Sequence, residues 1–373
     1  MRLLITCPFG FVSTLNQELK YLRFSPVDSF DTGTYVETDM LGMMTINLQS
    51  RIASKVYIQV NEPTFCDTFD NLFLLTQAID RTQRLPASEF LSITAHSFQS
   101  TLMSEKSLQS IVHKAILSQV MAVWSSLKNP TSEPYEIMVQ LINNKTTLFL
   151  NSSGEWLHKR GYRLDQWAAS LKENVAAGLI LMSGRRRQQL LRDPCCGSGT
   201  ICIEAAMIAR NIAPGLLRSF AFQWFTSYDE VQFTSLITQI KAKSYPDKQF
   251  AIFWSDNDPE MLEKSSANAQ RAWVADPIAF FDRDLFHQLP EQLQHQTDKQ
   301  TVIVTNPPYG KRLAPEWLKD IYRSLVNLSK DPTTHFTCIT SYPEFSHLLT
   351  TRRPRKEVKN GQDDVHVWIK PRG

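Results

Sequence analysis

The sequence of 373 residues lacks several features that would place it in a special class of protein. No apolar run approaches the roughly 18 residues that a membrane-spanning helix needs. The amino terminus, MRLLITCPFG, has only a short apolar stretch and no small-residue cleavage site. The six cysteines show neither Cys-x-x-Cys spacing nor a paired framework, and the eight histidines have no ligand spacing. We therefore expect free thiols, a cytoplasmic protein, no contact with a membrane and no metal.

The sequence also has no large net charge, because 40 basic side chains nearly balance 37 acidic ones. Residues 1–150 have 11 basic and 13 acidic side chains, whereas residues 151–192 have 8 basic and 3 acidic ones. A polyanion would therefore meet the protein mainly at this segment, unless the segment is a solvated linker helix. The candidate phosphate contacts are Arg160, Arg163, Arg185, Arg186 and Arg187. The basic stretch 351–359, TRRPRKEVK, is a second candidate.

The chain is long enough for two or three domains. In residues 1–150, short β-rich runs alternate with helical stretches, which predicts one or two small α+β layers. The expected strands are TYVETD, KVYIQV, FLSITAHSF and the hairpin YEIMVQLINNKTTLFL, and the expected helices are VSTLNQELKYL, NLFLLTQAIDRT and SLQSIVHKAILSQVMAVWSSL. We place the N-terminal module at 1–154, a basic linker with a helix at 155–192 and a second domain at 193–373.

The second half of the sequence shows a different pattern, in which strands and helices alternate. A long helical pattern runs from about residue 166 to a stop at Gly184. Strands are then expected at RQQLLR, QFAIFWS, IAFFD, TVIVT, HFTCIT and VHVWIK, with helices between them at TICIEAAMIARN, PEMLEKSSANAQRAW and PEWLKDIYRSLVNLS. This pattern predicts a doubly wound α/β sheet, in which ligands bind beyond the carboxyl ends of the strands.

The loop DPCCGSGT joins the first of these strands to a helix. Gly197 and Gly199 remove Cβ atoms, so the backbone can turn tightly and approach a ligand. A dinucleotide site needs a third glycine where this chain has Cys202, which disfavours NAD. Asp193 at the head of the loop suits the cationic sulfonium and amino group of S-adenosylmethionine better than a pyrophosphate. A glycine-rich turn without a ligand is the alternative.

Two further acids follow the next two strands. Asp256 ends one of them, where a carboxylate can accept both hydroxyl hydrogens of a ribose. Asp284 follows the other and is placed to accept a hydrogen bond from an adenine amino group. Asp258 is placed to cap the following helix. Each acid alone is readily explained as a cap or turn residue, but three acids beside a glycine-rich loop predict a cofactor site.

The stretch TVIVTNPPYG ends a buried strand on Asn306, Pro307, Pro308 and Tyr309. The Asn306 side-chain oxygen and the Pro307 carbonyl can each accept one N–H of a planar exocyclic amine, and proline fixes that carbonyl in place. Tyr309 offers a face on which an extruded base can stack. The pattern therefore predicts methylation of an amine on a base, with positioning as the main source of catalysis.

The segments DPCCGSGTICIEAA, NIAPGLLRSFAFQWF and TNPPYGKRL together resemble the THUMP-domain RNA guanine-N2 methyltransferases, which modify 23S ribosomal RNA and tRNA. The stretch LHKRGYR at 157–163 is similar to the junction motif of that family. The resemblance covers residues 151–373 strongly and the first 150 residues weakly. The motif Asn-Pro-Pro-Tyr is shared with adenine-N6 methylases, so the junction and the NIAPG segment are the specific parts.

The resemblance implies a class I Rossmann-like methyltransferase domain preceded by an α+β ferredoxin-like and THUMP module that binds structured RNA. It also implies a role for each site residue: Asp193, Gly197 and Gly199 for the methionine moiety, Asp256 for the ribose, Asp284 for the adenine, and Asn306, Pro307 and Tyr309 for the target base. The chain departs from the family at Cys195, where an aromatic is usual, and in AASLKE, which lacks a proline. The acidic balance of residues 1–150 is a third departure.

We therefore expect a methyltransferase that uses S-adenosylmethionine and acts on the N2 amine of a guanosine, in ribosomal RNA rather than tRNA. Adenine-N6 methylation of DNA is the alternative enzyme activity. An RNA-binding or assembly factor without turnover is an alternative of another class, and the intact loop and Asn-Pro-Pro-Tyr motif argue against it.

Overall fold

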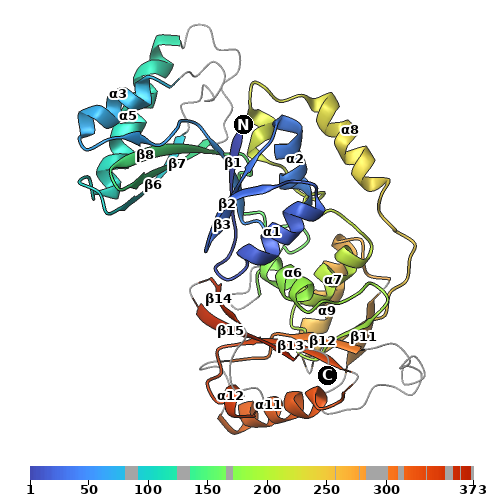
Figure 1. Ribbon diagram of the computed structural model, residues 1–373. Helices are drawn as coiled ribbons and strands as arrows, with labels where there is room; N and C mark the ends of the chain where they lie inside the picture. The colour runs from blue at the N-terminus through green and yellow to red at the C-terminus, as the bar shows by residue number, and fades with distance from the viewer. Residues whose placement is uncertain are drawn as a thin grey trace.

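The computed structural model describes residues 1–79, 91–123, 135–164, 171–256, 258–276, 278–282, 301–309, 315–332, 334–348, 356–361 and 363–370. These residues form two β-sheets with helices packed against them (Figure 1). In the parts of the chain that are described, no helix is long and apolar enough to cross a membrane. The six cysteines are free, as predicted, and all but Cys195 are buried.

The N-terminal sheet runs without a break through both halves of the first 151 residues. Its strands are β1 (Arg2–Thr6), β2 (Pro26–Phe30), β3 (Gly33–Glu37), β4 (Lys55–Gln59), β5 (Thr64–Phe65), β6 (Leu91–Phe98), β7 (Tyr135–Ile142) and β8 (Lys145–Asn151). Their order is β2-β3-β1-β4-β8-β7-β6, with β5 paired to β8. The pairing of β4 with β8 joins the two halves, so this module is one eight-stranded sheet rather than two separate layers.

Helices α1 (Val12–Tyr21) and α2 (Met40–Gln49) accompany the first half of this sheet, and α3 (Phe69–Gln77) and α5 (Glu105–Val123) the second. In Figure 1 strands β6–β8 with α3 and α5 extend away from the sheet of the second half of the chain, and we call these elements, together with β5, which pairs with β8, the lobe. Side-chain caps begin several of these helices. Asp39 accepts a hydrogen bond from the Gly42 N–H over 2.8 Å at α2, and Thr68 caps α3 in the same way.

The second sheet has the order β11-β10-β9-β12-β13-β15-β14. Its strands are β9 (Leu190–Asp193), β10 (Ile252–Asp256), β11 (Ile278–Asp282), β12 (Thr301–Thr305), β13 (His335–Thr340), β14 (Lys356–Asn360) and β15 (Asp363–Lys370). Strands β9 to β13 are parallel, whereas β15 is antiparallel to both of its neighbours. The strand order reverses between β9 and β12, and this switch point is where a doubly wound sheet binds its ligands. The predicted fold class is confirmed.

The helices of the second half are α6 (Glu173–Met182), α7 (Thr200–Ala209), α8 (Glu230–Lys241), α9 (Pro259–Arg271), α11 (Pro315–Ser329) and α12 (Phe345–Leu348), with a short 3₁₀ helix η2 (Ala221–Trp224). Within the described residues, the helical pattern expected from residue 166 begins at Glu173. Residues 356–359 of the basic stretch lie in β14, and residues 351–355 lie outside the described residues.

The N-terminal module packs directly on the second domain at α6. A Cβ added at Gly178 would lie 2.3 Å from the Phe11 ring, so only glycine lets α6 come this close. Asn174 at the start of the same helix donates to the Ser54 hydroxyl over 3.2 Å. Residues 173–180 are all buried, so α6 is a structural layer between the two sheets. The domain boundaries at residues 154 and 192 remain a prediction.

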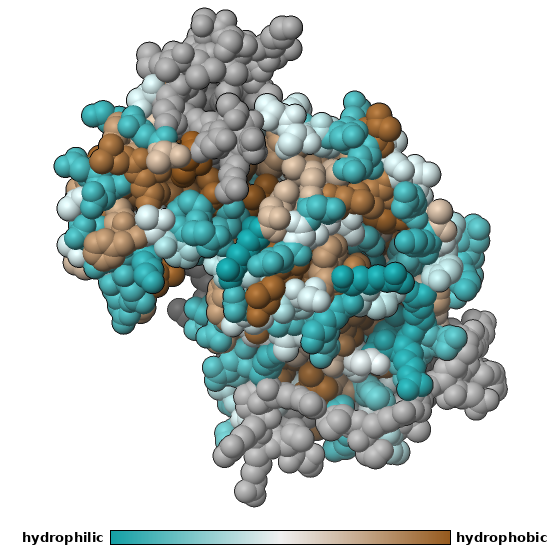
Figure 2. Space-filling view, turned by 45° about the horizontal axis from the view of Figure 1, so that its top comes forward, coloured by the Kyte–Doolittle hydropathy of each residue, from teal (hydrophilic) through white to brown (hydrophobic). Residues whose placement is uncertain are grey.

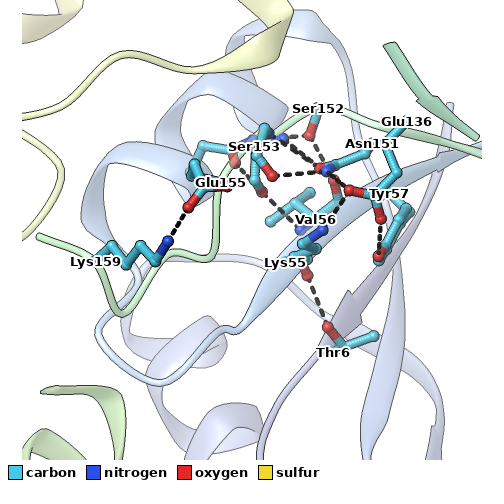
Figure 3. A network of polar contacts seen from close by, with 12 residues as sticks. Thr6, Lys55, Val56, Tyr57, Glu136, Asn151, Ser152, Ser153, Glu155 and Lys159 are labelled. Atoms are coloured by element: carbon cyan, nitrogen blue, oxygen red, sulfur yellow. Dashed lines mark hydrogen bonds and ion pairs between the residues drawn. The ribbon is translucent and has the colours of Figure 1, made fainter. Parts of the chain in front are cut away.

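A polar network fixes the exit of the chain from the N-terminal sheet (Figure 3). Asn151 donates to the Glu136 carboxylate over 3.0 Å and to the Gly154 carbonyl over 2.8 Å. Lys55 forms an ion pair with the same carboxylate, and its ammonium lies 4.6 Å from the centre of the Trp156 ring. These contacts join β4, β7 and β8 to the segment that leads into the second domain, and so hold that segment in one position.

Candidate cofactor and substrate site

Three of the predicted site residues meet at the switch point of the catalytic sheet. Strand β9, which ends at Asp193, pairs with β10 on one side and β12 on the other. Because all three strands are parallel, their carboxyl ends lie along one edge. Asp193 and Asp256 end two of these strands, and Asn306 directly follows the third. The structure therefore brings these three side chains to one edge, as the sequence predicts.

Asp193 is fully buried and only half satisfied. Its Oδ1 accepts a hydrogen bond from the Thr305 hydroxyl over 2.9 Å and one from the Cys195 N–H over 3.2 Å. Its Oδ2 is buried and has no hydrogen-bond partner in the described part of the chain. Burial raises the pKa of Asp193 to about 7, and the negative charge of Asp256 adds to the shift. A buried acceptor without a donor costs free energy, so this oxygen indicates a missing cationic or N–H partner.

The loop between β9 and α7 depends on two glycines. Gly197 has φ +50°, and an added Cβ would meet nothing within 4 Å among the described residues, so the space beside the loop is open. Gly199 has φ +80°, and an added Cβ would lie 2.8 Å from the Trp254 ring and 2.9 Å from the Ser265 Cβ. Both positions therefore require glycine for the left-handed backbone, and Gly199 also for close packing against β10 and α9.

Asp256 holds the loop through its carboxylate. Its Oδ2 accepts a hydrogen bond from the Gly197 N–H over 2.8 Å, and its Oδ1 accepts one from the Asp258 N–H over 3.1 Å. Asp258 itself accepts from the Glu260 N–H over 2.9 Å, which confirms its predicted role as the cap of α9. The predicted adenine contact, Asp284, lies outside the described residues.

The segment after β12 presents a second unsatisfied oxygen. Asn306 Oδ1 is buried and has no hydrogen-bond partner among the residues that are described. The Pro308 carbonyl accepts a hydrogen bond from the Tyr322 hydroxyl over 3.3 Å, and this bond fixes the Pro-Pro segment against α11. Tyr309 is half-buried, and its hydroxyl accepts a long hydrogen bond, 3.5 Å, from the Asn360 side chain on β14. Burial raises the pKa of Tyr309, so its phenol stays neutral at physiological pH.

These features fit S-adenosylmethionine. The unpartnered Oδ2 of Asp193 suits an ammonium group, because a buried carboxylate is stabilised by an adjacent cation. The open space at Gly197 leaves room for a ligand against the backbone of the loop. Within the described ranges, no group of three His, Cys, Asp or Glu residues could hold a metal ion.

Two of the predicted phosphate contacts are engaged inside the protein, which corrects that prediction. Arg160 is 2% exposed, and its guanidinium donates to the Leu157 and Arg51 carbonyls and pairs with Glu204 at 3.4 Å. Arg163 is also largely buried, with its Nε 3.6 Å from the Glu173 carboxylate. Both guanidiniums are occupied by the protein's own groups, so neither is presented to a phosphate.

The other three arginines lie at the opposite edge of the sheet from the loop. Arg185, Arg186 and Arg187 precede the amino end of β9, whereas the cofactor loop follows its carboxyl end. The four residues of β9 span about 13 Å. Arg185 donates to the Gln189 carbonyl over 3.2 Å, and the Arg187 guanidinium lies 5.0 Å from the Tyr245 ring. These side chains are therefore not beside the carboxyl-end site, and they remain candidates only for contacts with a distant part of a large RNA.

Sequence reasoning missed the contacts that hold the loop from outside. Asn268 on α9 donates to the Ser198 carbonyl over 3.2 Å, and Arg271 donates to the Asn268 side chain and to the Tyr162 carbonyl over 2.7 Å. Arg163 donates to the Thr200 hydroxyl at the start of α7. These contacts join distant segments, and no local pattern signals them.

The two family-specific segments pack against each other. Arg218 in the NIAPG segment donates to the carbonyls of Trp156 over 2.6 Å and Glu155 over 2.8 Å. Gly161 has φ +102°, and an added Cβ would lie 2.4 Å from the Leu217 carbonyl oxygen. Gly215 donates its N–H to the Leu48 carbonyl of the N-terminal module over 3.0 Å. The segments therefore form one unit that joins the N-terminal module to the catalytic domain.

Family models match both parts of the chain. Residues 160–366 match the model described as RMKL-like, methyltransferase domain. Residues 2–57 match the model described as RlmL ferredoxin-like domain. The expected order, a ferredoxin-like module followed by a Rossmann-like methyltransferase domain, is confirmed by these matches.

Similar proteins match this chain along almost its whole length. A putative RNA methyltransferase of Bacillus subtilis, YpsC, is 34% identical over 99% of this chain and 96% of its own length. The ribosomal RNA large subunit methyltransferase K/L of Saccharophagus degradans is 28% identical over 98% of this chain. The match covers 50% of that relative, so the chain spans about half the length of the K/L proteins it resembles.

Two solved structures are similar along their full length. One is described as a predicted N6-adenine-specific DNA methylase from Listeria monocytogenes, with a TM-score of 0.88 and 31% identity over 99% of this chain and 96% of that one. The other is a putative methyltransferase complexed with SAH, with a TM-score of 0.86 and 26% identity over 100% of this chain and 98% of that one.

Proposed function

We propose that this chain, which belongs to the family of RMKL-like methyltransferases, transfers a methyl group to the exocyclic N2 amine of a guanosine in RNA. Its methyl donor is S-adenosylmethionine, in agreement with the SAH complex of a similar structure. The names of relatives in Bacillus and Saccharophagus support RNA as the substrate, and the second supports ribosomal RNA of the large subunit. We propose that the reaction takes place in the cytoplasm.

The single observation that carries this proposal is the pair of unsatisfied buried oxygens at one edge of the sheet. Asp193 Oδ2 and Asn306 Oδ1 are both buried without a partner in the described part of the chain. The strands that lead to them, β9 and β12, are paired neighbours. One oxygen suits a cation and the other an N–H donor, so the edge is suited to a cationic cofactor beside an amine.

S-adenosylmethionine supplies an electrophilic methyl group on a sulfonium, which is an excellent leaving group. Asp193, Gly197, Gly199 and Asp256 are the residues that we propose to hold it. A guanine N2 amine is a poor nucleophile because its lone pair is delocalised into the ring. Asn306 Oδ1 and the Pro307 carbonyl accept its two N–H groups and turn the lone pair toward the methyl group. Tyr309 offers its ring as a stacking face for the base.

A strong general base is not needed for this reaction. The amine can lose its proton to water after the methyl group has been transferred, because the methylated nitrogen is then strongly acidic. Asn306 binds and orients the amine but does not take its proton. Catalysis therefore comes mainly from orientation, which well-placed hydrogen-bond acceptors provide.

A second candidate function is adenine-N6 methylation of DNA, since the similar Listeria structure is described in those terms. Asn-Pro-Pro-Tyr can hold the N6 amine of adenine in the same way as the N2 amine of guanine. The names of the Bacillus and Saccharophagus relatives favour RNA, because both are described as RNA methyltransferases. A tRNA guanosine is a third candidate substrate, and an RNA-binding factor without turnover is the alternative of another class.

One experiment separates these candidates. The purified protein is incubated with labelled S-adenosylmethionine and, separately, with 23S ribosomal RNA, tRNA and DNA from a strain that lacks the gene. The products are digested to nucleosides and identified by mass spectrometry. The proposal predicts label in N2-methylguanosine from ribosomal RNA. Label in N6-methyladenine from DNA would establish the second candidate instead, and no label with any substrate would favour the factor without turnover.

A further inference from the structure

Four exposed side chains form one row across the end of the lobe. Phe98 on β6 pairs in register with Ile142 on β7, Ile142 pairs with Lys145 on β8, and Lys145 pairs with Phe65 on β5. Side chains of residues that pair in register point to the same face of a sheet. Neighbouring strands lie about 4.8 Å apart, so the row is about 14 Å long. We call it the aromatic row, because a phenyl ring stands at each end.

The aromatic row belongs to the solvent-facing side of the sheet. Phe98 is 62% exposed, Phe65 is 61% exposed and Ile142 is 44% exposed. Leu141 and Thr146, the chain neighbours of Ile142 and Lys145, point to the other face and are completely buried. The core of the lobe therefore does not need the two phenyl rings. In Figure 2 apolar surface is also visible on the lobe, at the upper left of the view.

The backbone beneath the row is held firmly. Asn143 and Asn144 form the β7–β8 turn with φ +52° and +57°, the conformation that a two-residue hairpin requires. The Asn143 N–H donates to the Phe98 carbonyl over 3.1 Å, and the Cys66 N–H donates to the Asn144 carbonyl over 2.7 Å. The Thr101 N–H donates to the Asn144 side chain over 2.7 Å. These bonds tie all four strands together at the row, so a ligand would meet a pre-organised surface.

The charge of the N-terminal module is wrong for a surface that binds the RNA backbone. Residues 1–150 have 11 basic and 13 acidic side chains, and a phosphate-binding surface needs a basic excess. Exposed aromatic rings on a sheet bind nucleic acid differently, since bases stack on them whatever the net charge. Lys145 lies between Ile142 and Phe65 in the row and supplies one cation for a phosphate.

We propose that the aromatic row is a platform on which unpaired bases of the substrate RNA stack, with Lys145 at the phosphate between them. The inference rests on the proposed function in taking RNA as the substrate, and it explains how an acidic module holds RNA. The partner is a single-stranded segment, because bases paired within a duplex do not expose their faces to a side chain.

The test uses the full-length protein and a fluorescein-labelled single-stranded 12-nucleotide oligoadenylate. The variant Phe65→Ala/Phe98→Ala removes both rings, and both sites are exposed, so the fold is retained. Each ring that stacks a base contributes on the order of tenfold to affinity. Phe98→Trp should retain binding and Phe98→Leu should lose it, because leucine keeps apolar area without a ring. The matched control is Leu74→Ala, which removes a side chain 61% exposed on helix α3 of the same lobe.

Two further readouts separate stacking from charge and from the catalytic site. Lys145→Gln should reduce the slope of log affinity against log salt concentration by about 0.7, the contribution of one phosphate contact to a single strand. The phenylalanine variants should leave this slope unchanged. Binding of SAH, measured by calorimetry, should be the same in all variants. A 12-base-pair RNA duplex should bind the wild type and Phe65→Ala/Phe98→Ala equally.

The outcomes are distinct. Wild-type affinity of Phe65→Ala/Phe98→Ala for the oligoadenylate would overturn the proposal, as would equal binding by Phe98→Leu and the wild type. A wild-type dimer that becomes monomeric in Phe65→Ala/Phe98→Ala by sedimentation would also overturn it, because a second copy would then cover the row. Nucleoside analysis of methylated ribosomal RNA judges the proposed function separately, since oligoadenylate binding requires no methyl transfer.

Discussion

The Thr305 hydroxyl donates a hydrogen bond of 2.9 Å to Asp193 Oδ1, and this bond joins the end of β12 to the head of the cofactor loop. The same bond orients the carboxyl so that its other oxygen remains buried without a partner in the described part of the chain. The substrate segment that begins at Asn306 follows Thr305 directly. With the proposed roles of Asp193 and Asn306, two adjacent residues at the end of β12 would position both the cofactor and the target base.

The affinity for the cofactor should depend on pH through Asp193. Its pKa is raised to about 7 by burial, so in the free protein the carboxyl is mostly protonated below that pH. An ammonium group binds the ionised form, so binding below pH 7 releases a proton. Affinity for SAH should therefore rise from pH 5.5 to about 7 and then level off. Calorimetry in two buffers with different ionisation enthalpies measures the proton release directly.

Asp193→Asn is the control for this pH dependence. The variant should bind SAH weakly and without the dependence between pH 5.5 and 7. In the wild type the folded-state pKa of Asp193 is above its unfolded value, so its contribution to stability is present below about pH 4 and is lost as the pH rises through 7. Asparagine has no charge to bury at this position. The cofactor-free variant should therefore be more stable than the wild type at pH 8, by up to about 4 kcal/mol in the free energy of unfolding. Equal stability at pH 8 would contradict a raised pKa.

Asn306→Ala should abolish methyl transfer and leave cofactor binding nearly intact. The Asn306 side-chain oxygen has no partner among the described residues, so its removal breaks no hydrogen bond within them. The rate should fall by about a hundredfold or more, because the amine loses its orientation. Single-turnover methylation and SAH calorimetry measure the two effects separately. A parallel loss of SAH affinity would show that Asn306 is structural.

The contacts that hold the cofactor loop from outside should influence affinity for the cofactor. Arg163 donates to the Thr200 hydroxyl, and Asn268 donates to the Ser198 carbonyl over 3.2 Å. Arg163→Gln or Asn268→Ala should weaken SAH binding by about three- to tenfold, the effect of one lost hydrogen bond. Arg323→Gln is the control, because Arg323 is exposed and forms its ion pair with Asp320, which is also exposed. Unchanged SAH affinity in both Arg163→Gln and Asn268→Ala would show that these contacts do not influence cofactor binding.

Gly161→Ala should destabilise the joint between the two domains. An added Cβ would lie 2.4 Å from the Leu217 carbonyl oxygen, and φ is +102°. We expect a loss of about 2–4 kcal/mol, measured by denaturant unfolding. Gly184→Ala is the matched control, because φ is also positive there but an added Cβ meets nothing within 4 Å among the described residues. Gly184→Ala should lower the free energy of unfolding by only about 1–2 kcal/mol.

The catalytic sheet could be predicted from the sequence because its signals are local. The central strands are short, largely apolar runs, such as TVIVT, and β9, β10 and β12 end at or directly before a polar residue of the site. The order of those residues along the chain then places Asp193, Asp256 and Asn306 on one edge. The cap at Asp258 was predictable for the same reason, since Pro259 follows it at the first position of the helix.

The contacts between distant segments could not be predicted in this way. Arg160 was assigned to phosphate because arginines in a basic segment commonly bind polyanions, but the fold buries it against Glu204, 44 positions away. Its hydrogen bond to the Arg51 carbonyl spans 109 positions. Charge counting gives the net balance of a segment and not the direction in which each side chain points. The choice between one and two N-terminal layers stayed open for a similar reason, because the pairing of β4 with β8 has no local signal.

The central claim is methylation of guanosine N2 in RNA, and one comparison tests it most directly. Modified nucleosides are quantified in 23S ribosomal RNA from a strain that lacks this protein, beside the wild type and a strain complemented with Asn306→Ala. We expect the loss of one N2-methylguanosine in the deletion strain, without recovery by Asn306→Ala. Retention of every N2-methylguanosine together with loss of an N6-methyladenosine would contradict it.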